Sequence, residues 1–401
     1  MARTGIKIQV KNTTLGGVPN VNANALLIVN NPDVEDEAEM PFVNDEFFML
    51  RSPDDLEPLG LNLPANKDLV EAVNDFYYPE TGVSNVGTVL WLYGGDYVDV
   101  ADATETIVTV LGLLSKTVVN GFEYRPRQIF MLETLASDPS KLLEVVDDNL
   151  APLTAINNAV SRAWDEGFTV NVVVATAIST GLALLPDLKT ANAPFVGVYI
   201  LRKHPTGTAT GLGLLGGYMA QLSVGTSIGD VSLPPVASAL YFANGVYTPA
   251  TSLSQSLAEE IGDKQYIFAR TRPPKNGLWF NDGATAADPS TALSSLEAVR
   301  TLGAIVDDLR LFFTSYINSK VPVTADGDIQ PAYKQVVLDN AFAKVVAPYI
   351  ESGDISDARL SLVAKNNDMV GTRTWEVSLS ILPAPTLRWI DGFVFYVKNL
   401  S

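Results

Sequence analysis

The chain has 401 residues, 27 Lys and Arg against 45 Asp and Glu, and a formal charge of −18 at pH 7. It has no cysteine and one histidine, which excludes a disulfide framework, a cysteine nucleophile and a multi-histidine metal site within one subunit. A hydrophobic content of 47% argues against disorder, and the acidic balance disfavours binding of nucleic acid through a basic face.

The N-terminal residues predict a short strand ahead of the body of the protein. Ile6, Ile8 and Val10 alternate with polar residues, which is the period of a strand with one apolar face. Gly16 and Gly17 then predict a flexible hinge. The segment lacks the basic-then-apolar pattern of a secretory signal.

The next part of the chain alternates strand-sized apolar runs with helical patterns. The predicted strands are Ala25–Val29, Thr88–Tyr93, Gln128–Leu132, Val170–Ala175 and Phe195–Leu201. The predicted helices are Thr104–Val119, one that begins at Asp138-Pro139, and one from Pro152 to Gly167. Continuous apolar strands between helices predict an α/β layer whose strands are buried on both faces. No apolar run reaches the ~20 residues needed to span a membrane.

Two long helices are predicted in the second half of the chain. An apolar stripe runs through residues 291–318, and a second helix covers Pro331–Ile350, with Lys334 and Lys344 on its polar side. The paired carboxylates Asp307-Asp308 are interpreted as surface residues of the first helix, and Asp326 and Asp328 as turn residues.

The C-terminal residues predict further strands with one apolar face. A lone strand has unpaired N–H and C=O groups, so it needs a sheet edge, either in its own chain or in a neighbouring subunit. The apolar positions are Trp375, Val377, Leu379 and Ile381, then Phe393, Phe395 and Val397, with Pro383 and Pro385 as the predicted hinge between them.

Two short motifs raise the alternative of a nucleotide-binding or serine-dependent enzyme that uses residues 211–229. Gly211–Gly216 matches GxGxxG, but the polar stretch His204–Thr210 separates it from the preceding strand, so close helix packing is the favoured interpretation. Ser227 lies in a GxSxG pattern, yet the single histidine, His204, precedes it, which is not the order of α/β-hydrolases. His204 is interpreted as a solvated turn residue, and neither a cofactor nor a metal ion is expected.

The order of several segments resembles contractile tail sheath proteins of phages and phage-derived injection systems. The similar segments are Phe48–Leu61, Val70–Tyr78 followed by Thr88–Leu92, Gly213–Gly229, Tyr266–Asp282, the helix from Leu293, and the step Gly353-Asp354-Ile355-Ser356. The resemblance covers nearly the whole chain. It departs in Ser227–Val236, where sheaths often carry a basic residue.

The resemblance implies an α/β (α+β) core domain with a mixed sheet flanked by helices, plus extended N- and C-terminal strand arms. It implies a strand arm and linker at 1–24, an α/β portion at 25–205, a core portion at 206–372 and a C-terminal arm at 373–401. The subunit would not be an enzyme. It would form stacked hexameric rings around an inner tube and contract to drive that tube through a target envelope.

Partners and location follow from the same resemblance. The chain would assemble with itself, with an inner tube protein and with baseplate and tail-terminator proteins, without nucleic acid and without membrane insertion. The particle would be a virion tail or a phage-like particle built in the bacterial cytoplasm. Because many copies at −18 repel one another, basic residues are expected at subunit contacts: Lys7, Lys11, Arg373 and Lys398 near the arms. Lys334 and Lys344 are the candidates for contact with the inner tube.

Overall fold

A computed structural model gives the fold. It describes residues 23–30, 32–33, 42–81, 83–97, 100–116, 125–131, 150–176, 182, 185–204, 210–236, 239–242 and 248–384. The predictions for the N-terminal strand, for the hinge residues Gly16, Gly17 and Pro385, and for the last strand lie outside these residues. So do Lys7, Lys11 and Lys398.

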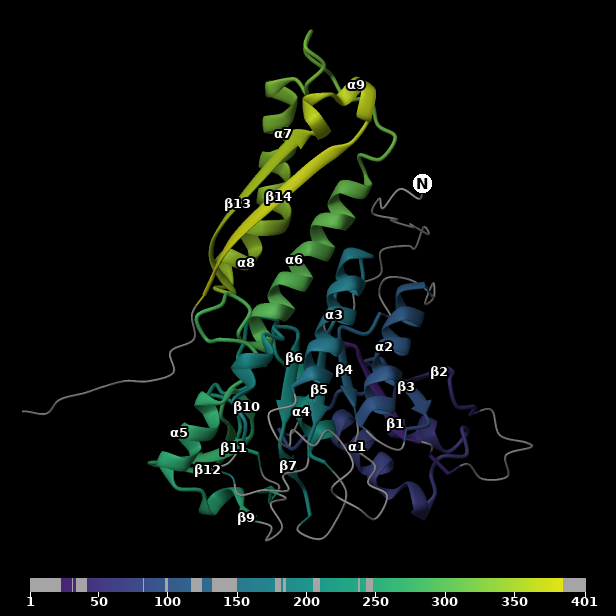
Figure 1. The fold of residues 1–401 in the computed structure, drawn as a ribbon, viewed down its shortest axis with the longest axis vertical. Coiled ribbons are helices and arrows are strands. Elements are labelled where there is room, and N and C mark those ends of the chain that lie inside the picture. Colours follow the sequence, from purple (N-terminus) through teal and green to yellow (C-terminus); the bar gives the residue numbers. More distant parts are fainter. Residues whose placement is uncertain are drawn as a thin grey trace, which may run out of the picture.

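In the described part of the chain, seven strands form the central sheet, in the order β10-β6-β5-β4-β1-β3-β2. They are β1 (Ala25–Asn30), β2 (Phe47–Leu50), β3 (Leu90–Gly95), β4 (Gln128–Met131), β5 (Asn171–Ala175), β6 (Val196–Tyr199) and β10 (Tyr266–Ile267). All neighbours pair in parallel except β2, which runs antiparallel to β3. The expected mixed sheet flanked by helices is therefore confirmed (Figure 1).

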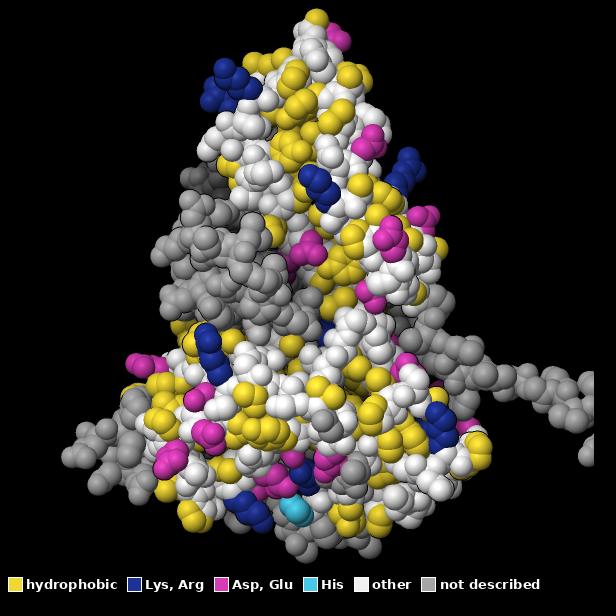
Figure 2. Space-filling view, turned by 180° about the vertical axis from the view of Figure 1, so that it is seen from behind, with side chains coloured by type: hydrophobic (Ala, Val, Ile, Leu, Met, Phe, Trp, Pro, Cys, Tyr) yellow, Lys and Arg dark blue, Asp and Glu magenta, His cyan; other side chains and the backbone are white. Residues whose placement is uncertain are grey.

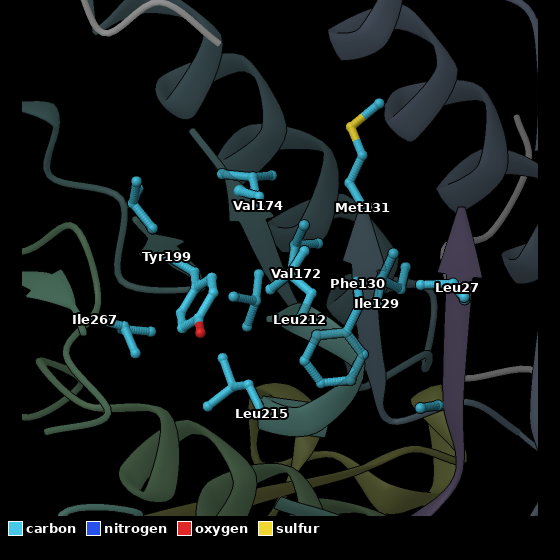
Figure 3. Packing of buried hydrophobic residues seen from close by; sticks show 14 of the residues in the cluster. Leu27, Ile129, Phe130, Met131, Val172, Val174, Tyr199, Leu212, Leu215 and Ile267 are labelled. Carbon is cyan, nitrogen blue, oxygen red and sulfur yellow. The ribbon is translucent and has the colours of Figure 1, made fainter. Parts of the chain in front are cut away.

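Helices pack in pairs beside this sheet. They are α1 (Lys67–Tyr77) with α4 (Leu212–Gln221), and α2 (Val100–Lys116) with α3 (Ala151–Asp165). Figure 3 shows why the strands are apolar throughout: Phe130 of β4 points toward Leu212 and Leu215 of α4, and the next residue, Met131, points away from α4. Strands with helices on both faces bury every side chain, as β4 and β5 do.

The glycine-rich segment forms α4, whose glycines allow a close approach to α1. A Cβ on Gly213 would overlap the backbone of Ala72, and one on Gly217 would lie 2.6 Å from the carbonyl oxygen of Asp75. A Cβ on Gly216 would lie 3.1 Å from the Phe130 ring. The glycines of the GxGxxG pattern thus serve helix packing, as the favoured interpretation of the sequence expected.

Short hairpins and one further helix extend the body below the sheet. They are β7 (Leu201–Arg202), β8 (Tyr241–Phe242) and β9 (Thr248–Pro249) in one sheet, β11 (Ala269–Arg272) with β12 (Lys275–Phe280) in another, and α5 (Gln255–Asp263). Single 3₁₀ turns occur at Pro53–Leu56, Pro64–Asn66, Leu188–Ala191, Ala250–Ser252 and Lys365–Asn367.

The helix α6 (Leu296–Thr314) leaves the body and carries the upper part of the molecule (Figure 1). It begins at the N-cap Ser295, whose hydroxyl accepts the N–H of Ala298. The second predicted helix is divided into α7 (Pro331–Ala341), a π-helical turn (Phe342–Val346) and α8 (Ala347–Glu351). The remaining elements are β13 (Ile355–Ala364), α9 (Met369–Thr372) and β14 (Trp375–Pro383).

The hydrophobic cores divide the chain elsewhere than at residues 205/206. One large cluster runs from Ala23 to Leu296 and includes β10, which lies beyond that boundary. Two smaller clusters begin at Ile305 of α6 and at Ile329, and each includes residues of β13. The predicted division at 205/206 stays a prediction, and the glycines of α4, which follow it, are buried.

The interpretation of Asp307 as a helix-surface residue is wrong. Asp307 is 1% exposed and forms ion pairs with Arg127, which precedes β4, and with Arg310 of α6. Thr169 also hydrogen-bonds its carboxylate. Its neighbour Asp308 accepts a hydrogen bond of 2.7 Å from the Tyr349 hydroxyl. The contacts of Asp307 with Arg127 and Thr169 fasten α6 to the body, and the Asp308 bond joins α6 to α8. The sequence alone did not indicate them.

Candidate assembly surface

The strands β13 and β14 form a long antiparallel hairpin. Their register runs from Ile355 opposite Pro383 to Ala364 opposite Trp375, with a bulge between Ile355 and Asp357. An isolated two-stranded sheet is at best marginally stable in water. This hairpin is therefore expected to depend on the helices beside it, which Figure 1 shows along its length.

One face of the hairpin is apolar and packs on those helices. Ile355 lies in a cluster with Ile305 and Val346, with Leu379 and Ile381 packed against it. At the other end, Trp375 meets an aromatic group, its ring centroid lying 6.3, 5.5 and 6.4 Å from those of Phe313, Tyr316 and Tyr333, respectively. The residues that alternate with these are mostly small and polar and face outward.

The two outer edges of the hairpin have no strand partner among the described residues. An open edge presents a row of N–H and C=O groups to which another strand can be added. Proteins usually block such edges with charges or prolines. In β14, only Glu376 is charged and the first proline is Pro383. In β13, the charges are Asp357 and Arg359. The hairpin thus has the properties of a sheet that accepts further strands.

The structure places the described residues of the predicted arm on this hairpin. Leu379 and Ile381 are half-buried, Val377 is 39% exposed, and Trp375 and Pro383 are the two ends of β14. One edge of this strand is therefore filled by β13 of the same chain. The donation of residues 375–381 to a neighbouring subunit stays a prediction.

The remaining basic candidates lie apart from the buried cores. Lys344 and Arg373 are exposed, and Lys334 is half-buried on α7. Arg373 has φ of 51° and ends α9 just before β14 begins. Their contacts with other subunits stay predictions.

Sequence reasoning missed β13, the pairing partner of β14. The signal was present, since Ala358, Leu360, Leu362 and Ala364 alternate with Arg359, Ser361 and Val363. Because these residues follow a long helix and the Gly353-Asp354 turn, they were interpreted as a short connection and not as a strand.

The structure does not bring a catalytic pair together at residues 211–229. The Ser227 hydroxyl accepts the N–H of Gly229 at 3.2 Å, whereas His204 contacts Glu71 of α1. All of Leu212–Ala220 is buried in helix packing, which leaves no open helix start for a phosphate. Among the described residues, no group of three or more His, Cys, Asp and Glu is placed to hold a metal ion. None of the described helices has the length and apolar character of a membrane span.

His204 belongs to a charged cluster between α1 and the end of β7. Lys203 Nζ lies 3.0 Å from Glu71 Oε1 and 2.8 Å from Asp75 Oδ2, and His204 Nε2 lies 3.2 Å from Glu71 Oε1. Figure 2 shows the histidine beside acidic and basic side chains at the lower end of the molecule. His204 is exposed, as its interpretation as a solvated residue expected. What sequence reasoning missed is its acidic partner, for which the signal is the pair Glu71 and Asp75, four residues apart on one helix face.

The pKa values of the two carboxyls of this cluster are shifted in opposite directions. Burial raises the pKa of Asp75 to about 6, against the pull of Lys203. Burial also acts on Glu71, but the hydrogen bond and charge of Lys203 outweigh it, so the pKa of Glu71 is lowered. Asp75 is the more deeply buried, with a side chain 12% exposed against 21% for Glu71.

The variant Asp75→Asn is expected to change how stability depends on pH. The folded state raises the pKa of Asp75 from 3.8 to about 6. The protonated carboxyl is favoured in the folded state, so the contribution of Asp75 to the unfolding free energy is full below pH ~4. This contribution is lost as the pH rises through ~6. The unfolding free energy of the variant, relative to wild type, should rise by up to about 3 kcal/mol between pH 4 and 7. Urea unfolding at four pH values measures it, with the exposed Asp326→Asn as control. A constant difference between Asp75→Asn and wild type would contradict the expectation.

Comparison with known proteins rests on structure alone. No protein-family model and no curated protein matches this sequence. Solved structures match over the whole chain. The chain has the fold of contractile-injection-system proteins.

Three structures illustrate this likeness. A chain of the anti-feeding prophage baseplate, six-fold symmetrised, matches with a TM-score of 0.62 and 11% identity, covering 100% of both chains. A chain of an extracellular contractile injection system, the PVC sheath complex in the contracted state, matches with a TM-score of 0.59 and 12% identity. The match covers 100% of this chain and 98% of that one. A chain of the anti-feeding prophage baseplate in the contracted state matches with a TM-score of 0.54 and 11% identity, covering 100% of both chains. The shared fold thus includes both the body and the hairpin part of the molecule.

Proposed function

We propose that this protein is the sheath subunit of a contractile injection system, a structural protein that polymerises around an inner tube. The observation that carries the proposal is the hairpin β13–β14, whose apolar face is packed and whose two outer edges lack partners in the described chain. Strand arms of neighbouring subunits would pair with these edges. The whole-chain likeness to a contracted sheath complex supports the same function.

Strand addition suits a contracting assembly for a physical reason. The bonds of an added strand are made between main chains, so they do not depend on a particular side-chain packing between subunits. Subunits can then rotate as rigid bodies while the strands stay paired. The work of contraction would come from the difference in packing between two subunit arrangements, without nucleotide hydrolysis.

The proposal assigns further contacts. Neighbouring subunits would form six-fold rings stacked in a helix, with Arg373 near the joined strands. The inner tube would meet the α7 side through Lys334 and Lys344. Baseplate and terminator proteins would contact the two ends of the tube. The particle would assemble in the bacterial cytoplasm and act outside it.

A second candidate is a baseplate subunit of the same kind of particle. Two of the similar structures are those of a baseplate, and this is the observation that favours it. A baseplate subunit would form a closed ring, whereas a sheath subunit would stack without limit. Electron microscopy of the purified, untagged protein distinguishes the two: striated hollow tubes support the sheath, and single rings support the baseplate subunit.

Removal of the N-terminal arm tests strand addition. Deleting Met1–Thr14 is expected to leave a folded protein, judged by circular dichroism, that remains monomeric in sedimentation. Two single variants provide a matched pair: Ile8→Asp, on the apolar side of the predicted strand, should abolish tubes, and Gln9→Asp, on its polar side, should keep them. Normal tubes from the deletion variant would refute the proposed role of the arm.

A further inference from the structure

Four arginines converge where α6 leaves the body. The Arg125 guanidinium donates to the Gly167 carbonyl at 3.0 Å, and that of Arg310 to the Trp164 carbonyl at 3.0 Å. Arg127 donates to the Thr169 hydroxyl at 2.6 Å, and Arg300 donates to the carbonyls of Met219 and Leu222, which end α4. The joint between the sheet and α6 is therefore unusually rich in buried positive charge.

Carboxylates lie among these arginines. Asp307 is shared between Arg127 and Arg310. Burial, with the like charges of Arg125 and Arg310, lowers the pKa of Arg127 to about 9. Burial lowers that of Arg300 to about 10, although Glu297 and Asp354 oppose the shift. An arginine still keeps its proton at neutral pH. The lowered pKa values therefore reflect the burial of these two guanidinium groups.

A small cavity lies at this joint. Its volume is about 20 Å³, and Arg127, Arg300, Asn171, Thr169 and Trp164 are among the residues that line it. Asn171 Nδ2 and Arg300 Nε are buried and have no hydrogen-bond partner among the described residues. Both are donors. The Thr169 hydroxyl is already bonded to Asp307, and the Trp164 N–H to the Val170 carbonyl.

We propose that this cavity binds one monatomic anion of the chloride class, held between Asn171 of β5 and Arg300 of α6. A single water needs about 10–15 Å³, so the cavity admits one particle of about that size and excludes tetrahedral oxyanions. A halide accepts hydrogen bonds from both donors and brings a negative charge beside the Arg300 guanidinium. The bound ion would join the sheet to α6, beside the Asp307 contacts. This site is independent of strand addition.

The test is the ³⁵Cl resonance of chloride in the presence of the purified full chain. Chloride is titrated into potassium gluconate at constant ionic strength, since gluconate is too large for the cavity. Wild-type protein is expected to broaden the ³⁵Cl line. This excess line width should saturate as chloride is added, and bromide should suppress it by competing for the site. Asn171→Leu removes one donor at nearly constant volume, and Arg300→Lys keeps the charge but removes Nε; each should weaken apparent chloride affinity at least tenfold. Asn276→Leu, an exposed position on β12, should behave as wild type.

Two results would overturn the proposal. A wild-type line width that increases linearly with chloride, without saturation, would mean that the cavity holds water. An excess that persists unchanged in both Asn171→Leu and Arg300→Lys would place the ion elsewhere. If Asn171→Leu does not fold, Arg300→Lys still decides between these outcomes, because it keeps a cation at the position.

Discussion

Of two neighbouring proline variants in β14, Val377→Pro and Ser378→Pro, one is expected to abolish tube formation while the subunit stays folded. Successive N–H groups of a strand point to opposite sides, so one of these groups pairs with β13 and the other faces the open edge. A proline at the inner position removes a ladder hydrogen bond and should destabilise the hairpin. A proline at the outer position leaves the ladder intact and removes a donor needed by an added strand.

The pair controls for the general effect of proline, because both variants restrict the backbone at adjacent residues of one strand. Thermal unfolding identifies the inner position, and electron microscopy of the stable variant gives the assembly result. The matching pair on β13, Ala358→Pro and Arg359→Pro, tests the other edge. Normal tubes from the stable variants of both strands would contradict strand addition to this hairpin.

The second large effect is expected at the joint between the body and α6. Asp307→Asn keeps the shape of the side chain but leaves Arg127 and Arg310 without the charge they share. Removal of one partner from a buried charge network typically costs about 3–5 kcal/mol of unfolding free energy. Chemical denaturation should therefore show a loss of that size.

Asp308→Asn is the matched control for this variant. Asp308 is the next residue of α6, and its carboxylate accepts one hydrogen bond, from Tyr349. A hydrogen bond to a charged group is worth about 1.5–3 kcal/mol, and the loss should be smaller here because asparagine keeps an acceptor oxygen. Equal losses for the two variants would mean that the buried network at Asp307 contributes no more than this one bond.

The main elements could be predicted because their patterns are local. The apolar runs at β1, β3, β4, β5 and β6 and the stripe of α6 follow from residue periodicity alone. The packing role of Gly211–Gly216 could also be inferred, because a polar segment precedes the motif. The likeness of fold to contractile-injection-system proteins agrees with the resemblance seen in the sequence.

The features that were missed depend on contacts between distant parts of the chain. Asp307 resembles any helix carboxylate in sequence, and only its contact with Arg127, 180 positions earlier, explains its burial. Lys203 pairs with Asp75 across 128 positions. The strand β13 is the exception, since the alternation of its residues is a local signal.

Helix α6 is shared between two hydrophobic cores, and this couples the body to the hairpin. Its first turn is anchored in the body through Leu296, and its later turns support the hairpin through Ile305 and Leu309. Its bonds to the body reach as far as Arg310, close to the end of its 19 residues. The body and the hairpin are therefore expected to move as one rigid unit, in which a displacement of the body is transmitted to the hairpin without bending of the helix.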